Sequence, residues 1–248
     1  MATALGIDIG GTGIKGAIVD TASGELLTER TKLPTPAGGE PAAIVDTVVA
    51  LIDRLGGLED GVPVGVCFPA VVKGGRTLSA ANVSKRWIGL EAEALFERAL
   101  GRDIHFVNDA DAAGVAEVRY GAARDRGGVV LLTTLGTGIG TALIHDGVLV
   151  PNTEFGHIEL HGKDAERQAA YSAMERKRLS WAKWAARLQE YYTTLERLLS
   201  PDLFIVGGGV SKNYREFFGH LSLATEIVPA ALRNNAGILG AAALAVRG

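Results

Sequence analysis

The sequence of 248 residues has little cysteine, no long apolar run and almost no excess charge. Its one cysteine, Cys67, excludes an internal disulfide and any zinc site built from several cysteines. No apolar run reaches the length of about 18 residues that predicts a membrane span, and the N-terminus MATALGIDIGG lacks the basic and apolar segments of a signal peptide. We therefore expect a cytoplasmic protein without membrane contact.

The charge balance excludes a broad attraction to polyanions. Lys and Arg number 25 against 28 Asp and Glu, which gives a formal net charge of −3. Nothing in this balance indicates nucleic-acid binding, and an anionic substrate would need a local basic patch. Hydrophobic residues make up 47%, and the 33 glycines lie among strand-like runs, which indicates a globular protein with many tight turns.

The N-terminal stretch GIDIGGTGIKGAIVD, residues 6–20, contains Gly11, Gly13 and Gly16 in the order G-x-G-x-x-G. A dinucleotide site requires a helix directly after these glycines, but IKGAIVD is typical of a strand. The Walker A pattern also fails, because Lys15 is followed by Gly16 instead of Ser or Thr. The pattern predicts a β-hairpin whose turn offers backbone N–H groups, the Thr12 hydroxyl and Lys15 to a phosphate. The alternative is an ordinary glycine-rich turn.

The same pattern occurs twice in the chain. GTGIKGAIVDTASGEL at 11–26 is echoed by GTGIGTALIHDGVL at 136–149, which suggests two related lobes that each carry such a hairpin. We place the first lobe at 1–107 and the second at 108–233, with a C-terminal helix at about 234–248 packing back on the first.

Hydrophobic periodicity predicts an α/β protein, with strands and helices mixed along the chain. The predicted strands lie at 4–9, 14–20, 25–33, 62–68, 103–107 and 202–209, besides the echo hairpin. The predicted helices lie at 42–55, 90–100, 109–122, about 164–199 and 236–246. Aromatic residues spaced by three and four around Trp181 and Trp184 indicate core or subunit packing instead of sugar stacking.

Five motifs together resemble the sugar kinases of the family of repressors, open reading frames and kinases (ROK). They are DIGGTGIKG, NDADAAG at 108–114, TLGTGIG at 134–140, NTEFGHIE at 152–159 and LFIVGGGVS at 203–211. The resemblance covers nearly the whole chain and is strongest to the bacterial members that use polyphosphate, the glucokinases and glucomannokinases. It implies a duplicated actin-like (ribonuclease H-like) fold with two lobes and a central cleft. It also implies phosphoryl transfer from inorganic polyphosphate and ATP to the 6-hydroxyl of glucose and also of mannose, with Mg²⁺, in a homodimer.

The resemblance assigns Asp109 as the general base that accepts the proton of the sugar hydroxyl. Asp109 follows a predicted strand and begins a predicted helix, where a carboxylate is also a common N-cap. Asp111 lies two residues further on, so on a helix it points away from Asp109.

The resemblance also supplies the sugar contacts. They are Asn82, Asn108, Asp109, Glu154, His157, Glu159 and Glu166. Taken alone, Glu154 is a solvated surface residue and His157 a structural or exposed one. Many members follow Gly-His with a Cys-x-Cys-Gly zinc loop, whereas this chain has IELHGKDAERQAA at 158–170. We therefore expect no structural zinc, an omission that polyphosphate-using members share.

The two Gly-Thr-Gly hairpins are the phosphate clamps that the resemblance implies. The clamp residues are Gly10, Gly11, Thr12, Gly13 and Lys15 in the first hairpin and Thr134, Gly136, Thr137 and Gly138 in the second, and Asp8 acts through Mg²⁺. Gly207, Gly208 and Gly209 would lie on the nucleoside side, with close helix packing as the alternative. Lys15, Lys85 and Arg86 are candidate cations for a polyphosphate chain, or else solvated surface charges.

Three classes of function stay open on the sequence. A sugar kinase is favoured, either with polyphosphate and ATP or as a strictly ATP-dependent hexokinase. A sensing relative without catalysis is expected to carry an N-terminal DNA-binding domain, whereas here the first strand starts at once. A dehydrogenase would need a helix after Gly16, where the sequence predicts a strand.

Overall fold

The computed structural model describes residues 3–246. The chain forms two compact units, Met1–Ala116 with Asn234–Gly248, and Glu117–Arg233. The division lies inside helix α3 (Asp109–Tyr120), beyond the sequence-based division between 107 and 108. Helix α7 (Ala236–Ala245), at the C-terminal end, belongs to the first unit.

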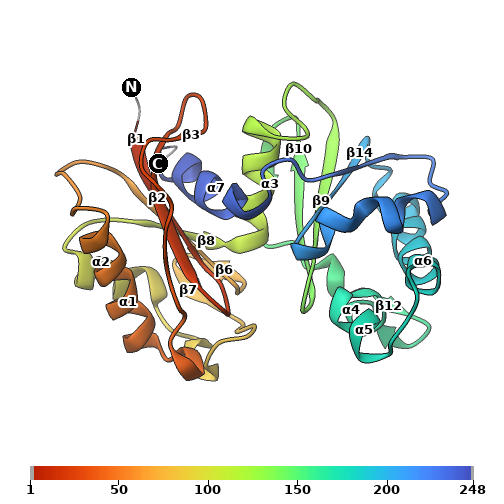
Figure 1. The fold of residues 1–248 in the computed structure, drawn as a ribbon, viewed down its shortest axis with the longest axis horizontal. Coiled ribbons are helices and arrows are strands. Elements are labelled where there is room, and N and C mark those ends of the chain that lie inside the picture. The colour runs from red at the N-terminus through yellow and green to blue at the C-terminus, as the bar shows by residue number, and fades with distance from the viewer. Residues whose placement is uncertain (1–2, 247–248) are drawn as a thin grey trace. The chain divides into compact units, whose positions relative to one another are not determined.

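The first unit is built on a sheet in the order β3-β2-β1-β5-β8, with β4 also pairing with β2 (Figure 1). The bounds are β1 Thr3–Ile9, β2 Ile14–Asp20, β3 Glu25–Leu26, β4 Thr31–Leu33, β5 Val64–Phe68 and β8 His105–Asn108. Strands β1 and β2 form the predicted antiparallel hairpin, whereas β5 runs parallel to β1 and to β8. The prediction of one continuous strand over 25–33 is wrong. The chain turns between β3 and β4, and both strands pair with β2.

Helices cover both faces of this sheet. Helix α1 (Pro41–Arg54) begins with a proline at its first turn and buries Ile44, Val48 and Leu51 in the core around β1. Helix α2 (Ala92–Leu100) ends at Gly101, whose φ of 65° is the left-handed conformation that stops a helix. Figure 1 shows α1 and α2 on one side of the sheet and α7 on the other.

Helix α7 lies with its backbone directly on β1 and β5. A Cβ added to Gly6 or Gly65 would come within 2.0 Å and 1.9 Å of the carbonyl oxygens of Ile238 and Ala241, respectively. Such a contact is possible only without a side chain. At the start of α7, Gly237 faces Asp8 in the same way, with its ideal Cβ 2.9 Å from the Asp8 carboxyl carbon. The start of α7 therefore packs directly against the Asp8 side chain.

The second unit has a sheet in the order β11-β10-β9-β14-β15. The bounds are β9 Val129–Leu135, β10 Ile139–His145, β11 Val148–Val150, β14 Leu203–Gly207 and β15 Glu226–Pro229. Strands β9 and β10 form an antiparallel hairpin around 136–138, as β1 and β2 do around 10–13, so the predicted repeat is confirmed (Figure 1).

The helical region of the second unit is divided into α4 (Glu166–Ala169), α5 (Tyr171–Arg176) and α6 (Trp181–Leu199). One long helix is therefore not formed, because Ala170 has an extended ψ of 154° and Arg178 a φ of 48°. Along α6, six residues are fully buried: Trp184, Ala185, Leu188, Tyr191, Tyr192 and Leu195. This confirms the packing interpretation of the aromatic residues.

Shorter elements connect these parts. They are β6 Val72–Lys73, β7 Arg76–Thr77, β12 Glu159–Leu160, β13 Lys163–Asp164 and the 3₁₀ turns Ala37–Gly39, Lys85–Trp87, Phe155–His157, Gly209–Glu216, Phe218–His220 and Arg233–Asn235.

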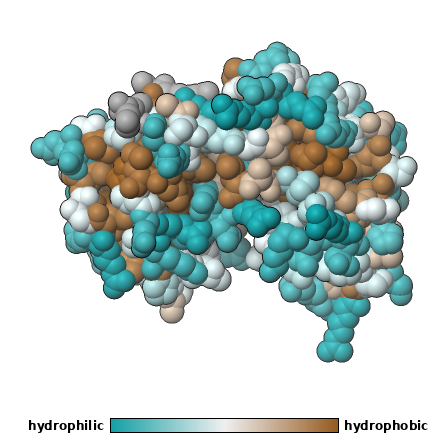
Figure 2. All heavy atoms as spheres, turned by 45° about the horizontal axis from the view of Figure 1, so that its top comes forward, coloured by the Kyte–Doolittle hydropathy of each residue, from teal (hydrophilic) through white to brown (hydrophobic). Residues whose placement is uncertain are grey.

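Within residues 3–246, every helix is too short or too polar to cross a lipid bilayer. Figure 2 shows polar residues interspersed with apolar ones on one face. Large exposed apolar side chains include Leu27, Leu78, Ile88, Leu198, and Val148 and Val150, which both belong to β11.

Candidate active site

The first hairpin places an ion pair beside its glycine turn. Asp8 of β1 and Lys15 of β2 are directly opposite in the register, and the Lys15 Nζ lies 2.8 Å from the Asp8 Oδ2. Their side chains are 17% and 22% exposed, respectively. A partly buried pair of this kind keeps both charges in place at the edge of the sheet.

The turn itself leaves donors for a ligand. The Gly10 N–H donates to the Gly13 carbonyl at 3.1 Å, which closes the turn and removes the Gly10 amide from the predicted phosphate donors. Gly11 and Thr12 are exposed, and their amides donate to no group among residues 3–246. Consecutive exposed amides at a glycine turn form the kind of concave group that binds anions.

Sequence reasoning missed a second cation at this turn. Lys32 of β4 lies directly opposite Lys15 in the β2–β4 register. An ideal Cβ on Gly13 would come 2.5 Å from the Lys32 Cε and 3.4 Å from its Nζ, so the lysine stem lies over the position where Gly13 has no side chain. The only sequence signal was the strand-like segment 25–33, whose register with β2 could not be read from the chain.

Asn82 also lies against this turn. Its Cβ is 3.0 Å from an ideal Cβ on Gly11, and its φ of 61° is left-handed. The two other candidate cations are engaged elsewhere: Lys85 donates to the Ala80 carbonyl at 3.2 Å, and Arg86 lies 3.3 Å from Glu40.

Asn108 and Asp109 occupy the junction between β8 and α3. The Asn108 side-chain oxygen accepts from the amides of Ala110 at 2.8 Å and Asp111 at 3.0 Å, and its amide donates to the Ala70 carbonyl at 2.9 Å. Asn108 therefore supplies the helix cap, the role that the sequence offered as the alternative for Asp109. Asp109 is half-buried and also accepts from the Ala110 amide, at 2.9 Å. Asp111 is fully buried.

The parallel strands bring these residues to one edge of the sheet. Asp8, Cys67 and Val107 follow one another across β1, β5 and β8, so Asn108 and Asp109 leave β8 at the same edge as the hairpin turn leaves β1. The carboxyl edge of parallel strands is the usual position of ligand sites in α/β proteins. Cys67 lies beneath it, and burial, with Asp8 and Asp109 nearby, raises the pKa of its thiol well above the ordinary value.

The second hairpin turn is held by helix α5. The Gly136 amide donates to the Gly138 carbonyl at 3.0 Å, and the Ser172 amide of α5 donates to the Gly136 carbonyl at 3.0 Å. Ser172 also donates its hydroxyl to the Thr137 carbonyl at 2.6 Å. Thr134 lies in β9, next to Gly207 of β14 in the parallel register.

The three glycines after β14 differ from one another. A Cβ on Gly208, which has a φ of 81°, would come 2.3 Å from the Leu135 carbonyl oxygen, so close packing explains this glycine. An ideal Cβ on Gly207 has no neighbour closer than 3.6 Å, and one on Gly209 has none within 4 Å. Packing therefore accounts for Gly208 alone.

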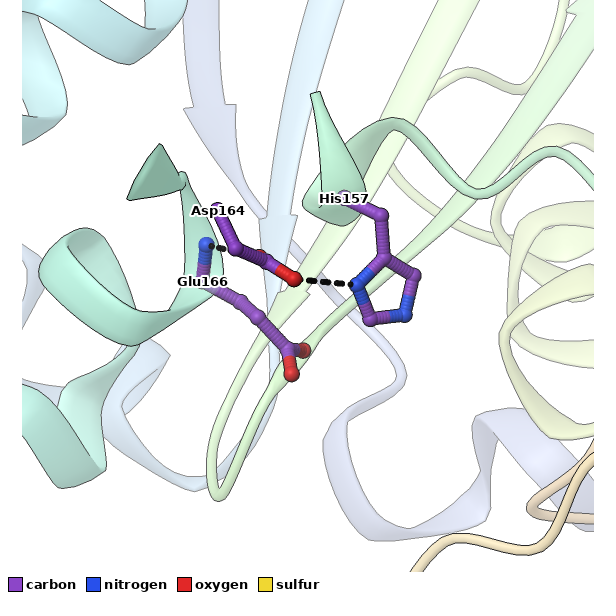
Figure 3. Close-up of side chains that lie close together, drawn as sticks. All are labelled: His157, Asp164 and Glu166. Atoms are coloured by element: carbon purple, nitrogen blue, oxygen red, sulfur yellow. Dashed lines mark hydrogen bonds and ion pairs between the residues drawn. The ribbon is translucent and has the colours of Figure 1, made fainter. Parts of the chain in front are cut away.

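His157 and Glu166 lie beside Asp164 in the second unit (Figure 3), and Glu154 lies beside His157. His157 Nδ1 lies 3.0 Å from the Asp164 Oδ2, and its Nε2 lies 3.8 Å from the Glu154 Oε2. The Glu166 amide donates to the Asp164 Oδ1 at 3.2 Å, and the Glu166 Oε2 accepts from the Ile139 amide at 3.2 Å. Glu166 therefore connects this group to the second hairpin turn. Asp164 was not expected from the sequence.

The surroundings shift two pKa values in this group. The hydrogen bond to Asp164 raises the pKa of His157, against a smaller lowering by burial, and Glu166 and Glu154 add to the rise. Burial raises the pKa of Glu154, although His157 partly offsets it.

His157, Asp164 and Glu166 place potential metal-ligand atoms within 4.8 Å of one another. Both Asp164 oxygens already accept hydrogen bonds, from His157 and from the Glu166 amide, so an ion would have to displace these contacts. Asp8 offers a carboxylate beside the exposed amides of the first hairpin turn, and oxygen is the ligand that Mg²⁺ prefers.

Comparison with known proteins places the chain in a family. The chain matches the ROK family over residues 4–170, and it belongs to that family. Its fold is the actin-like α/β fold of the ROK sugar kinases, as the resemblance predicted.

Relatives match almost the whole chain. A polyphosphate glucokinase of Mycobacterium tuberculosis is 46% identical over 97% of this chain and 90% of its own length. The crystal structure of an inorganic polyphosphate/ATP-glucomannokinase from Arthrobacter sp. strain KM superimposes with a TM-score of 0.94 at 50% identity, over 100% of this chain and 99% of that one. A ROK glucokinase from Streptomyces griseus, solved with glucose and AMPPNP, gives a TM-score of 0.81 at 25% identity, over 99% and 100% of the two chains.

Proposed function

We propose that this protein is a polyphosphate glucokinase, which transfers a phosphoryl group from inorganic polyphosphate to the 6-hydroxyl of glucose. The observation that carries the proposal is the pair of similarities over nearly the whole chain, at 46% to a polyphosphate glucokinase and at 50% to a polyphosphate/ATP-glucomannokinase. Neither a strictly ATP-dependent hexokinase nor a sensing protein is favoured by these relatives.

Asp109 is the general base of this proposal. It accepts the proton of the glucose 6-hydroxyl while the hydroxyl oxygen attacks the terminal phosphorus and the phosphoanhydride bond breaks. Support comes from its neighbour: Asn108 caps α3 with its side-chain oxygen, so the helix does not depend on Asp109 for its cap. Helix capping alone would not require a carboxylate beside the Asn108 amide at this junction.

The first hairpin binds the donor. The exposed amides of Gly11 and Thr12 and the ammonium groups of Lys15 and Lys32 form a cationic turn that can hold more than one phosphate. Asp8 keeps Lys15 in position and is the residue that would hold Mg²⁺ through its water ligands. The ion, when bound, offsets the negative charge of the transferred phosphate.

Glu154, His157 and Glu166, together with Asn82 and the remaining amide proton of Asn108, are the proposed contacts of the sugar hydroxyls. Carboxylates accept hydroxyl protons, and the imidazole and amide groups supply donors, which matches the mixed character of a ring of hydroxyls. A buried hydroxyl without a partner costs on the order of 1–3 kcal/mol, so these contacts select the sugar.

ATP as a second donor and mannose as a second acceptor also belong to the proposal, because the related structure is named for both activities. Gly207 and Gly209 stay candidates for the nucleoside side, since packing does not explain them. A homodimer and a cytoplasmic location stay predictions.

The product tests the reaction directly. Purified protein is incubated with isotopically labelled glucose, Mg²⁺ and polyphosphate, and the product is identified by NMR. We expect phosphorus coupling at carbon 6 of the sugar. Binding of glucose without any phosphorylated sugar would favour the sensing alternative.

A further inference from the structure

Asp164 contacts both His157 and Glu166, two of the proposed sugar contacts in the second unit. It ends the short strand β13, which pairs with β12, and its side chain is 30% exposed. One carboxylate oxygen faces His157 Nδ1 at 3.0 Å, and the other accepts the Glu166 amide at 3.2 Å. Both oxygens are therefore committed to residues that we propose as sugar contacts (Figure 3).

We infer that Asp164 is a positioning residue for the sugar: it fixes the orientation of His157 and the start of the helix that carries Glu166. The inference rests on the proposed function, since it takes His157 and Glu166 as sugar contacts. It adds a residue that would not itself touch the substrate.

The contact with His157 determines what the imidazole offers to a ligand. A carboxylate accepts a hydrogen bond from Nδ1, so the ring carries its hydrogen there and turns Nε2 away from Asp164. Nε2 lies 3.8 Å from Glu154, the neighbouring proposed sugar contact. The groups that act on His157 are Asp164 on β13, Glu166 on α4 and Glu154 just before the 3₁₀ turn, and together they raise the pKa of the ring against a smaller lowering by burial. A protonated imidazole donates at Nε2 to a hydroxyl oxygen.

The contact with Glu166 links the sugar residues to the second hairpin turn. The Asp164 Oδ1 accepts the amide of Glu166 at the first residue of α4. The carboxylate of Glu166 then accepts the Ile139 amide, and an ideal Cβ on Gly138 would come 2.4 Å from its Oε2. A shift of Asp164 would therefore move Glu166 against the 136–138 turn.

The chain offers a matched control on the same hairpin. His161, in the turn between β12 and β13, forms an ion pair with Glu190 of α6. Replacing Glu190 by Gln also removes a carboxylate from a histidine, and it also loosens this hairpin. It leaves Asp164 and its two contacts intact.

The test compares D164N, D164E and E190Q. For D164N we expect the glucose KM to rise about tenfold with kcat changed by less than about twofold, because positioning of the bound sugar is lost and the chemistry is not. The His157 titration, followed by NMR, is expected to move down toward the ordinary pKa of about 6.5. D164E keeps the charge and should partly restore the glucose KM and the His157 titration. E190Q should resemble the unmodified protein in both.

The outcomes separate this inference from the proposed function. Unchanged KM and unchanged His157 titration in folded D164N, beside a raised KM in H157Q, would overturn the role of Asp164 and leave the sugar site in place. An unchanged KM in H157Q and E154Q as well would overturn the sugar site itself. Equal changes in D164N and E190Q would mean that hairpin stability, and not positioning, causes the effect. Circular dichroism and thermal melting establish that each variant folds.

Discussion

Lys32 and Lys15 lie directly opposite each other on β4 and β2, beside the turn of the first hairpin. Two like charges in this position destabilise a sheet unless a negative charge balances them. Asp8 pairs with Lys15 at 2.8 Å, whereas Lys32 has no carboxylate within ion-pair distance in the described part of the chain. The arrangement is suited to a bound polyanion.

Replacing Lys32 by Ala should therefore weaken polyphosphate binding. We expect the KM for polyphosphate to rise about three- to tenfold at low salt, with a smaller dependence on salt, because one screened charge interaction is lost. The KM for ATP should change less, since a short donor contacts fewer cations. Lys73→Ala, at an exposed lysine of β6, is the control. Equal effects of K32A on both donors would contradict a role in polyphosphate selection.

Asp109→Asn tests the general base. Asn keeps the shape of Asp but does not accept the hydroxyl proton, so kcat should fall by about 10²–10⁴-fold while the glucose KM changes little. Steady-state kinetics with both donors measures the effect. Asp111 is unsuitable as a control because it is fully buried, and Asp103→Asn, at an exposed position before β8, serves instead. Near-normal turnover in D109N would refute the assignment.

The raised pKa of His157 makes a contribution to stability that depends on pH. Because the folded protein binds the His157 proton more tightly, the contribution is fully present below the unfolded pKa of about 6.5 and is lost as pH rises through the folded value. His157 is 54% exposed, so solvent screening keeps the effect small. Melting temperatures of the protein and H157Q should thus differ most at low pH and converge at high pH. A difference in melting temperature that grows with rising pH would contradict this prediction.

Local patterns predicted much of the fold. Each Gly-Thr-Gly turn lies between two strands that are rich in β-branched residues. Both hairpins could therefore be predicted from residues that are neighbours in the chain. The strand-to-helix junction at Asn108 was equally local, although the sequence offered Asp109 as the helix cap and the structure gives this role to Asn108. Only the hydrogen bonds of the Asn108 side chain decide this.

Contacts between distant or irregular segments were not predictable in the same way. Lys32 meets the Gly13 turn through the β2–β4 register, and a shift by one residue would turn its side chain to the other face. The segment from about 164 to 199 was expected to be largely helical, but Asp164 ends strand β13, where it contacts His157. Lys32 and Asp164 both lie outside the five motifs that carry the family resemblance.

The central claim is tested most directly by kcat/KM for glucose phosphorylation with polyphosphate and with ATP, each measured on one preparation at low and at moderate salt. We predict activity with polyphosphate that exceeds activity with ATP at low salt. We also predict that the polyphosphate value falls more steeply as salt screens the contacts of a long anion with Lys15 and Lys32. Phosphorylation of glucose with ATP, and none with polyphosphate at either salt concentration, would contradict the account.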